Sequence, residues 1–211
     1  MMSFSAPAQA STFVWKDSVH GFTFSFPDSW TVQTEDVPTT RIRIAGPIGE
    51  DFAICRVKTE KDGRLKIYPK RLMTEAVVET LDRKFWESEV AGNENAVVTD
   101  YHAPASLGGH GDATAIKTAF VAGKVNMHGA MIGSIYADTR YIVSCSSKAG
   151  QFAKYAPVFA SIMGSVELAQ KYHPFATGFY RDFLADPKLK LVRTKPGTVW
   201  RKDEYILNSG F

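Results

Sequence analysis

The clearest pattern in the chain is an alternation of aromatic and small polar residues within residues 21–30. Phe22, Phe24 and Phe26 occupy every second position, the spacing of a strand with one face in a core and the other in water. Pro27 follows at once, and because proline has no backbone N–H it ends the ladder of hydrogen bonds. The stretch therefore predicts a core strand, a turn, and three aromatic rings in one core.

The same two-residue period predicts an antiparallel sheet. In residues 41–44 isoleucines alternate with arginines, and in residues 51–58 Ala53, Cys55 and Val57 form an entirely apolar face. Short turns join the last three strands into a meander. The predicted strands are residues 12–16, 19–26, 30–33, 41–44, 51–58, 96–101, 113–122, 125–136 and 141–146.

Two segments show the longer period of helices. The first covers residues 69–90, where apolar side chains recur every four positions from Met73 to Phe85. The second covers residues 149–168, and Pro157 inside it predicts either a kink or a later start. Strands, a long helix, a meander and a closing helix together predict an α+β fold.

Composition divides the chain into three parts. Residues 1–11 contain Ala8-Gln9-Ala10, which fits the small-x-small rule of a signal-peptidase site but lacks a basic start. We interpret this part as the remnant of an export leader, with a short disordered cytosolic tail as the alternative. Residues 12–168 are the predicted folded domain, and residues 169–211 are a C-terminal extension.

Overall composition limits the classes of function. The chain has 211 residues, 45% of them hydrophobic, which suits a packed globular core and excludes a disordered chain. Its net charge of +3 is too small to argue for a nucleic-acid partner. No run of residues approaches the roughly 18 apolar positions of a transmembrane span. We therefore expect a protein without a transmembrane segment that does not bind nucleic acid.

The two cysteines, Cys55 and Cys145, each lie in a predicted strand. Cysteine is among the most buried residue types, which favours two buried free thiols. A disulfide is the alternative if the two strands are neighbours in an exported protein. The chain has no C-x-x-C motif, so neither a redox pair nor a zinc knuckle is indicated.

The aromatic strand that ends in proline and is followed by tryptophan resembles the PsbP-like superfamily. That group includes the extrinsic PsbP protein of photosystem II, the Ran-binding Mog-type proteins and bacterial DcrB-like proteins. The matching residues are Gly21, Phe22, Phe24, Phe26, Pro27 and Trp30, and residues 160–166 are similar to the end of such domains. The likeness covers about residues 12–168 and implies an antiparallel β-sheet flanked by helices, a PsbP-like α/β/α sandwich.

The resemblance also implies a type of function. The superfamily is mostly non-catalytic and acts by docking on other proteins, sometimes as an assembly factor or chaperone. It therefore implies an accessory or assembly protein that is not an enzyme, needs no cofactor, and docks on a protein partner or a membrane-associated complex. The leader-like start places it in the periplasm or another exported location, with the cytoplasm as the alternative.

The C-terminal extension is the most suggestive stretch for partner binding. It holds eight basic residues against four acidic ones and also eight aromatic residues. Such a segment can dock on an acidic protein surface or on anionic lipid heads, or it can simply cover a sheet edge of its own domain. The predicted partner-binding residues are Lys188, Lys190, Arg193, Trp200, Arg201 and Lys202.

An alternative from another class is a metal-dependent or hydrolytic enzyme that uses the region from residue 102 to 112. The predicted metal ligands are Asp100, His102, His110 and Asp112, which bracket a presumed loop over residues 103–111. An exposed polar loop that binds no metal is the simpler interpretation, because the ligand spacing matches no known motif.

Two further motifs were compared with known phosphate-binding and hydrolase motifs. The glycine-rich stretch 107–112 has no Lys-Ser/Thr after it, so a hairpin is favoured over a phosphate-binding loop. Ser144, Ser146 and Ser147 surround Cys145, yet the chain lacks the G-x-S-x-G motif of a hydrolase. A small-ligand-binding protein is the last alternative, and it requires a sizeable apolar pocket between the sheet and a helix.

Overall fold

The structure is a computed structural model that describes residues 11–33, 37–47, 49–65, 72–108 and 110–169. The predicted leader remnant and the extension beyond residue 169 lie outside these residues. The strands are β1 Thr12–Asp17, β2 Phe22–Pro27, β3 Thr31–Gln33, β4 Thr40–Ala45, β5 Ile54–Lys61, β6 Glu94–Leu107, β7 His110–Ala122, β8 Val125–Tyr136, β9 Thr139–Lys148 and β10 Glu167–Leu168. The α-helices are α1 Met73–Thr80, α2 Arg83–Val90 and α3 Phe152–Gly164.

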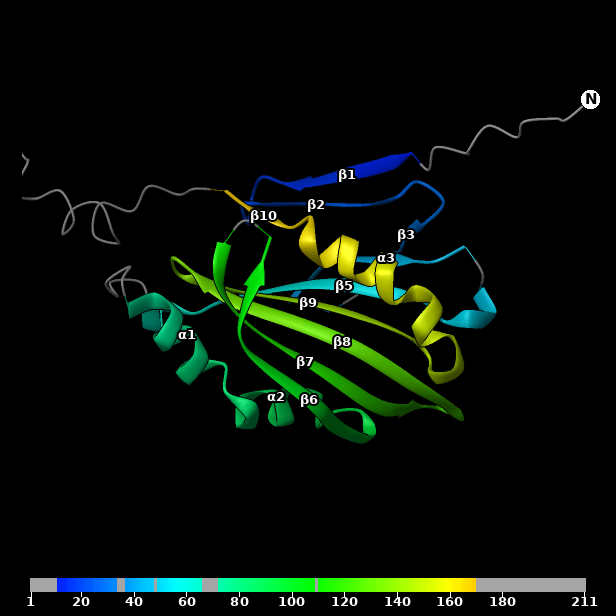
Figure 1. Cartoon of the computed structure of the whole chain (residues 1–211). Helices are drawn as coiled ribbons and strands as arrows, with labels where there is room; N and C mark the ends of the chain where they lie inside the picture. The colour runs from blue at the N-terminus through cyan, green and yellow to red at the C-terminus, as the bar shows by residue number, and fades with distance from the viewer. Residues whose placement is uncertain (1–10, 34–36, 48, 66–71, 109, 170–211) are drawn as a thin grey trace, which may run out of the picture.

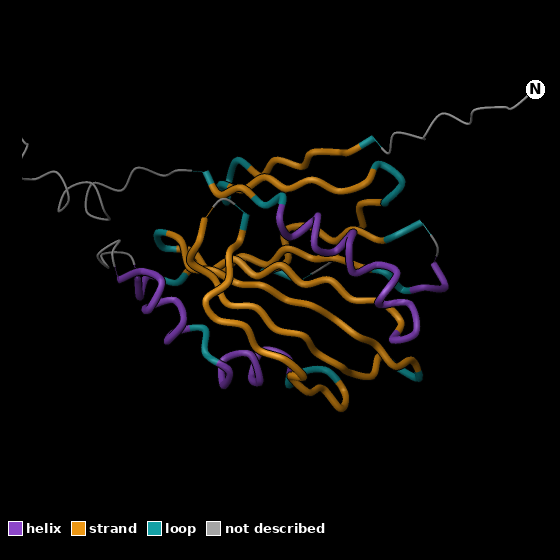
Figure 2. Tube along the Cα trace, viewed as in Figure 1, coloured by secondary structure: helices purple, strands orange, loops and turns teal. Residues whose placement is uncertain are grey.

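The strands form two antiparallel sheets. The larger has seven strands in the order β3-β4-β5-β9-β8-β7-β6, and the smaller has three in the order β1-β2-β10. Figure 1 shows α3 and the small sheet on one side of the seven-stranded sheet, and α1 and α2 on the other. Figure 2 shows the same layers by type of element. The predicted α+β class and the sandwich of helices around an antiparallel sheet are confirmed.

The main core lies between the large sheet and the layer of α3 and β2. Phe22, Phe24 and Phe26 are at most 2% exposed, and they share one cluster with Trp30 and Phe159. The ring of Trp30 meets that of Phe159 edge-on, with centroids 6.3 Å apart. The aromatic strand predicted from its period is therefore a core strand, and its rings are what α3 packs against.

The opposite face of the large sheet is anchored by a single tryptophan. Trp86 of α2 is fully buried, and its indole Nε1 donates to the hydroxyl of Thr114 at 2.8 Å. Gly133 of β8 makes room for it, because a Cβ there would lie 3.0 Å from the Trp86 ring. α1 packs beside it through Val77 and Leu81. These contacts place α1 and α2 mainly over β6, β7 and β8.

The prediction of one helix over residues 69–90 is wrong at its centre. The described part consists of α1 and α2, which are separate helices. Asp82 is in extended backbone conformation and its carboxylate accepts the N–H of Phe85 at 2.8 Å, so it caps a new helix. The apolar stripe continues across this break because both helices face the same sheet. Residues 69–71 lie outside the described part.

Two other predicted boundaries are corrected. The closing helix ends at Gly164 instead of continuing to residue 168, and Glu167–Leu168 forms β10 against β2. The strand predicted over 96–101 extends from residue 94 to 107, so most of the presumed loop 103–111 is strand. The prediction missed this part because β6 is an edge strand on which residues 102–104 and 106 are exposed, so the stretch lacks the apolar alternation of a half-buried strand.

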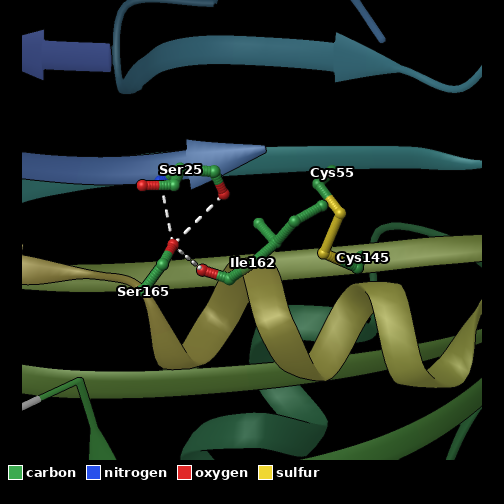
Figure 3. Close-up of a disulfide and its surroundings, with 5 residues drawn as sticks. All are labelled: Ser25, Cys55, Cys145, Ile162 and Ser165. Atoms are coloured by element: carbon green, nitrogen blue, oxygen red, sulfur yellow. Dashed lines mark hydrogen bonds between the residues drawn. A yellow bond between two sulfur atoms is a disulfide. The ribbon is translucent and has the colours of Figure 1, made fainter. Parts of the chain in front are cut away.

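The preference for free thiols is also wrong, because Cys55 and Cys145 form a disulfide. The residues are directly opposite each other on β5 and β9, with Cα atoms 4.0 Å apart. Both are 1% exposed and lie under α3, near Ile162 (Figure 3). Free cysteines are the usual buried form, but strand pairing overrides that tendency where two cysteines share a register position.

Ser165 links the end of α3 to β2 (Figure 3). Its Oγ accepts the N–H of Ser25 at 2.8 Å, and it lies 3.1 Å from the Ser25 carbonyl and 2.8 Å from the Ile162 carbonyl, to either of which it can donate. β10 reaches only Phe22 and Thr23, so this side chain takes the place of a strand neighbour at Ser25.

We expect Ser165→Ala to lower the free energy of unfolding by about 1–3 kcal/mol, because it leaves the half-buried backbone groups of Ser25 without this partner. Urea unfolding measures the change. Ser161→Ala is the matched control, since Ser161 is an exposed position on the same helix and should change stability by less than about 0.5 kcal/mol. Equal effects of the two substitutions would contradict the role assigned to Ser165.

Two buried carboxylates, one before β5 and one after it, form ion pairs with basic side chains. Arg64 donates to Asp62 at 2.8 and 2.6 Å, and Arg140 lies 3.3 Å from the same carboxylate. Asp51 accepts the hydroxyl of Tyr155 at 2.8 Å and Lys154 at 3.1 Å. The hydrogen bonds from Arg64 lower the pKa of Asp62, and those from Tyr155 and then Lys154 lower the pKa of Asp51.

Stability should therefore fall at acid pH. A carboxylate with a lowered pKa stabilises the fold above its unfolded pKa of about 3.9, and this contribution is lost as pH falls through the folded value. We expect the thermal midpoint to be flat from pH 7 to about 5 and to decrease below pH 4. Asp62→Asn should make that decrease shallower, whereas Glu87→Gln at an exposed position should not. A slope unchanged by Asp62→Asn would contradict the role of this carboxylate.

Candidate functional site

The predicted metal ligands do not form a ligand set. Asp100 lies on edge strand β6, where its carboxylate is 2.9 Å from His102 Nε2 and 3.2 Å from Lys117 Nζ. Lys117, and with it His102, lowers the pKa of Asp100. All three side chains are largely exposed. The ammonium group of Lys117 occupies the position next to the carboxylate that a cation would take.

Asp112 is distant from this pair. Asp100 is opposite Lys117 on β7, and Asp112 is five residues from Lys117, roughly 17 Å along the strand. Its carboxylate accepts the hydroxyl of Thr74 at 2.5 Å. The backbone of His110 starts β7, and its side chain is outside the described part. Within the described residues, no three His, Cys, Asp or Glu side chains gather as a metal site.

The serine cluster of the hydrolytic alternative is divided between two faces of β9. Ser147 is fully buried and its hydroxyl lies 3.4 Å from the carbonyl of Lys148. His128 is opposite Ser147, but its ring packs edge-on against Phe152 with centroids 6.0 Å apart. Cys145 is in the disulfide and is not a nucleophile. Ser144 and Ser146 face the opposite side of the sheet, where they line a groove.

A groove of about 510 Å³ lies between the large sheet and the end of α2. It occurs where the central strands carry small residues on this face, since Ser146 of β9 is opposite Gly129 of β8, which is opposite Thr118 of β7. Val90 and Asn93 form the wall at the end of α2. We call this hollow the sheet groove. It lies between sheet and helix, where the small-ligand alternative required a pocket, but its lining is only partly apolar.

One wall of the sheet groove is cationic. Arg43 of β4 and Arg56 of β5 are directly opposite each other, and both line the groove together with Lys58. Lys58 pairs with Glu89 of α2 at 2.5 Å. Both arginines also interact within the chain. The other wall, on β7 and β8, is apolar and contains Phe120, Met127 and Met131.

A second surface lies on the edges of the two sheets. β1 and β3 are outer strands, and Figure 1 shows both away from α1 and α2. Phe13, Val14 and Val32 are 49%, 61% and 48% exposed, which is unusual for large apolar side chains. Trp15 and Val32 line a hollow of about 220 Å³ between the strands. We call Phe13, Val14, Trp15 and Val32 the edge surface.

Trp15 has an uncommon environment in the edge surface. Its indole Nε1 is buried, and in the described part of the chain it has no hydrogen-bond partner. Buried tryptophan N–H groups usually find an acceptor. Trp15 Nε1 is therefore a buried donor that the described residues leave unsatisfied.

The predicted partner-binding residues Lys188, Lys190, Arg193, Trp200, Arg201 and Lys202 all lie outside the described residues. In the part that the structure describes, no helix has the length and apolarity needed to cross a membrane. Neither the sheet groove nor the edge surface was predicted from the sequence. Residues 12–16 were predicted as a strand, but only the strand order shows that β1 has a free edge.

Comparisons with known proteins agree with this architecture. Neither a protein-family model nor a curated protein matches the sequence. Among solved structures, the cyanobacterial PsbP protein CyanoP from Synechocystis sp. PCC 6803 is similar with a TM-score of 0.55 and 14% identity, over 80% of this chain and 98% of that chain. LpqN, involved in cell envelope biogenesis of Mycobacterium tuberculosis, is similar with a TM-score of 0.52 and 11% identity, over 75% and 91%.

At these identities the likeness shows the fold alone. It confirms the PsbP-like fold that the aromatic strand and its flanking residues predicted. Because a fold hosts many functions, the function must be argued from the surfaces of this chain.

Proposed function

We propose that this chain is a non-catalytic accessory or assembly protein that docks on a macromolecular partner outside the reducing cytoplasm. The observation that carries the proposal is the edge surface, where three large apolar side chains are about half exposed or more on two outer strands. Phe13 and Val14 are neighbours on β1 and therefore lie on opposite faces of the strand, so exposed apolar side chains flank this edge on both faces. Exposed apolar patches on a domain surface mark protein-binding sites.

The chemistry of the edge surface favours an extended protein segment as the partner. Outer strands present N–H and C=O groups to which another strand can pair, a common mode of peptide recognition. Trp15 and Val32 line the hollow beside these strands and can accept one apolar side chain of the partner. The partner therefore contributes backbone hydrogen bonds and one apolar anchor.

The disulfide supports a proposal about the cellular compartment of the protein. Disulfides persist in oxidising compartments and are rare in the cytosol. The buried Cys55–Cys145 disulfide supports a periplasmic or otherwise exported location. CyanoP and LpqN share the fold, and the second is involved in cell envelope biogenesis, which is consistent with an accessory role at an envelope.

The basic extension is the second partner contact in this proposal. Lys188, Lys190 and Arg193 alternate with apolar residues, and Trp200 precedes two further basic residues, Arg201 and Lys202. Such a segment suits an acidic surface of a protein in a membrane-associated complex. Deletion of residues 171–211 should weaken capture of the partner and leave cooperative unfolding intact.

Affinity capture from the native host tests the edge surface. Val32→Asp puts a charge beside the hollow and should reduce recovery of the partner at least tenfold, because the charge would be desolvated on docking. Val97→Asp is the matched control, since Val97 is 54% exposed on the other outer strand, β6. Equal capture by the two variants would contradict docking at the edge surface.

A further inference from the structure

The sheet groove has the dimensions of a small-molecule site. Its volume of about 510 Å³ lies within the range of about 300–1,000 Å³ typical of such sites. The floor is formed by small residues on three adjacent strands, Ser146, Gly129 and Thr118. Short side chains at these positions leave the sheet surface open between two taller walls.

The two walls differ in polarity. Arg43, Arg56 and Lys58 stand on β4 and β5, while Phe120, Met127 and Met131 stand on β7 and β8. β5 and β8 are separated by β9 alone, so the nearest strands of the two walls are two strand spacings apart, roughly 10 Å. A ligand that crosses the groove therefore meets cations at one end and apolar side chains at the other.

The charges on the cationic wall favour a single anion. Glu89 is the acidic side chain among the described lining residues, and it already pairs with Lys58 at 2.5 Å. Arg43 and Arg56 are directly opposite each other on the neighbouring strands β4 and β5, so both side chains start from the same point of this wall. Each guanidinium has five N–H donors, so an anion can bind in addition to the contacts made within the chain. Lys148 adds a cation near the groove mouth, 5.2 Å from the ring of Phe52.

We propose that the sheet groove binds a medium-chain carboxylate, an amphiphile with one anionic head and an unbranched apolar tail. The carboxylate lies at Arg56 and the opposing Arg43, where planar guanidinium groups form paired hydrogen bonds. The alkyl tail crosses Ser144 and Ser146 and contacts the flexible thioethers of Met127 and Met131, which adapt to irregular ligands. This proposal goes beyond the docking role of the edge surface, although Thr40 and Arg43 line both hollows.

Binding of dodecanoate to the full chain tests the proposal, by calorimetry below the critical micelle concentration. We expect saturable binding of one dodecanoate per chain. Dodecanol, with the same tail and no charge, should bind at least tenfold more weakly, and dodecyltrimethylammonium should not bind. Equal binding of dodecanol and dodecanoate would overturn the proposal, and so would the absence of saturable dodecanoate binding.

Variants locate the site. Arg56→Gln should weaken dodecanoate binding at least tenfold, and Ser146→Trp should abolish it by filling the floor of the groove. Lys117→Gln removes the same charge from the opposite face of β7 and should leave binding unchanged. An unchanged affinity in Arg56→Gln, or a similar loss in Lys117→Gln, would overturn the assignment. Arg56 does not line the hollow of the edge surface, so partner capture by Arg56→Gln should stay normal.

The NMR signals of the methionine methyl groups provide a second measurement. It uses the unmodified protein and therefore does not depend on whether a variant folds. Dodecanoate should shift the methyl signals of Met127 and Met131, which line the groove. The signals of Met73 in α1 and Met163 in α3 should not move. Shifts confined to the latter pair, or no shift of Met127 and Met131 at saturation, would overturn the proposal.

Discussion

Loss of the Cys55–Cys145 disulfide should lower the free energy of unfolding by about 4 kcal/mol. The bond joins residues 90 positions apart, so in the unfolded chain it closes a long loop and removes much conformational freedom. A small domain has about 5–15 kcal/mol of stability in all, so the reduced protein should be close to unfolding at 37 °C. Urea unfolding with and without reductant measures the difference.

The double variant Cys55→Ala/Cys145→Ala controls for effects of the reductant itself. Its unfolding midpoint should be low and should not move when reductant is added. The wild type should move toward it only after reduction in urea, since both sulfur atoms lie under α3 in the core. A wild-type midpoint that is the same in both conditions would contradict a stabilising role for the bond.

Gly108→Ala should destabilise the fold by about 3 kcal/mol or more. Gly108 has φ of 58° at the tip of the β6–β7 hairpin, and a Cβ there would lie 1.5 Å from the carbonyl oxygen of Val166. The neighbouring Leu107 is fully buried in the main core. To admit the methyl group, the hairpin tip must leave the end of α3, which exposes Leu107. Glycine at position 108 therefore allows the hairpin tip to pack against the residues that follow α3.

Gly123→Ala separates the clash from backbone strain. Gly123 has φ of 64° in the β7–β8 turn, and a Cβ there meets no atom within 4 Å. It should cost only the strain of a left-handed alanine, about 1 kcal/mol. Urea unfolding of both variants gives the comparison. Equal destabilisation would show that the contact between Gly108 and Val166 is not what requires glycine.

Local patterns predicted the fold well where one periodicity dominates. Phe22, Phe24 and Phe26 needed only their spacing to be placed in a core. The patterns failed where one polar side chain sets the backbone conformation. At Asp82 the carboxylate caps a new helix, although the apolar stripe continues across this position. They also failed at Cys55 and Cys145, because which strands pair is a long-range property of the sheet.

The candidate sites were less predictable for the same reason. Arg43 and Arg56 appear as ordinary outward-facing residues in the sequence, and only the register of β4 with β5 places them opposite each other. Asp100 and Asp112 appear close in the sequence, but an extended strand separates them by roughly 17 Å. Val32 stands out only once β3 is known to be an outer strand.

Site-specific photocrosslinking in the native host tests the central claim, docking through the edge surface, most directly. A photoreactive residue at position 32 should form one discrete crosslinked species with a protein partner, in the periplasmic or envelope fraction. The same residue at position 97, equally exposed on β6, should form none. A crosslink at 97 but not at 32, or none at either position in intact cells, would contradict the account.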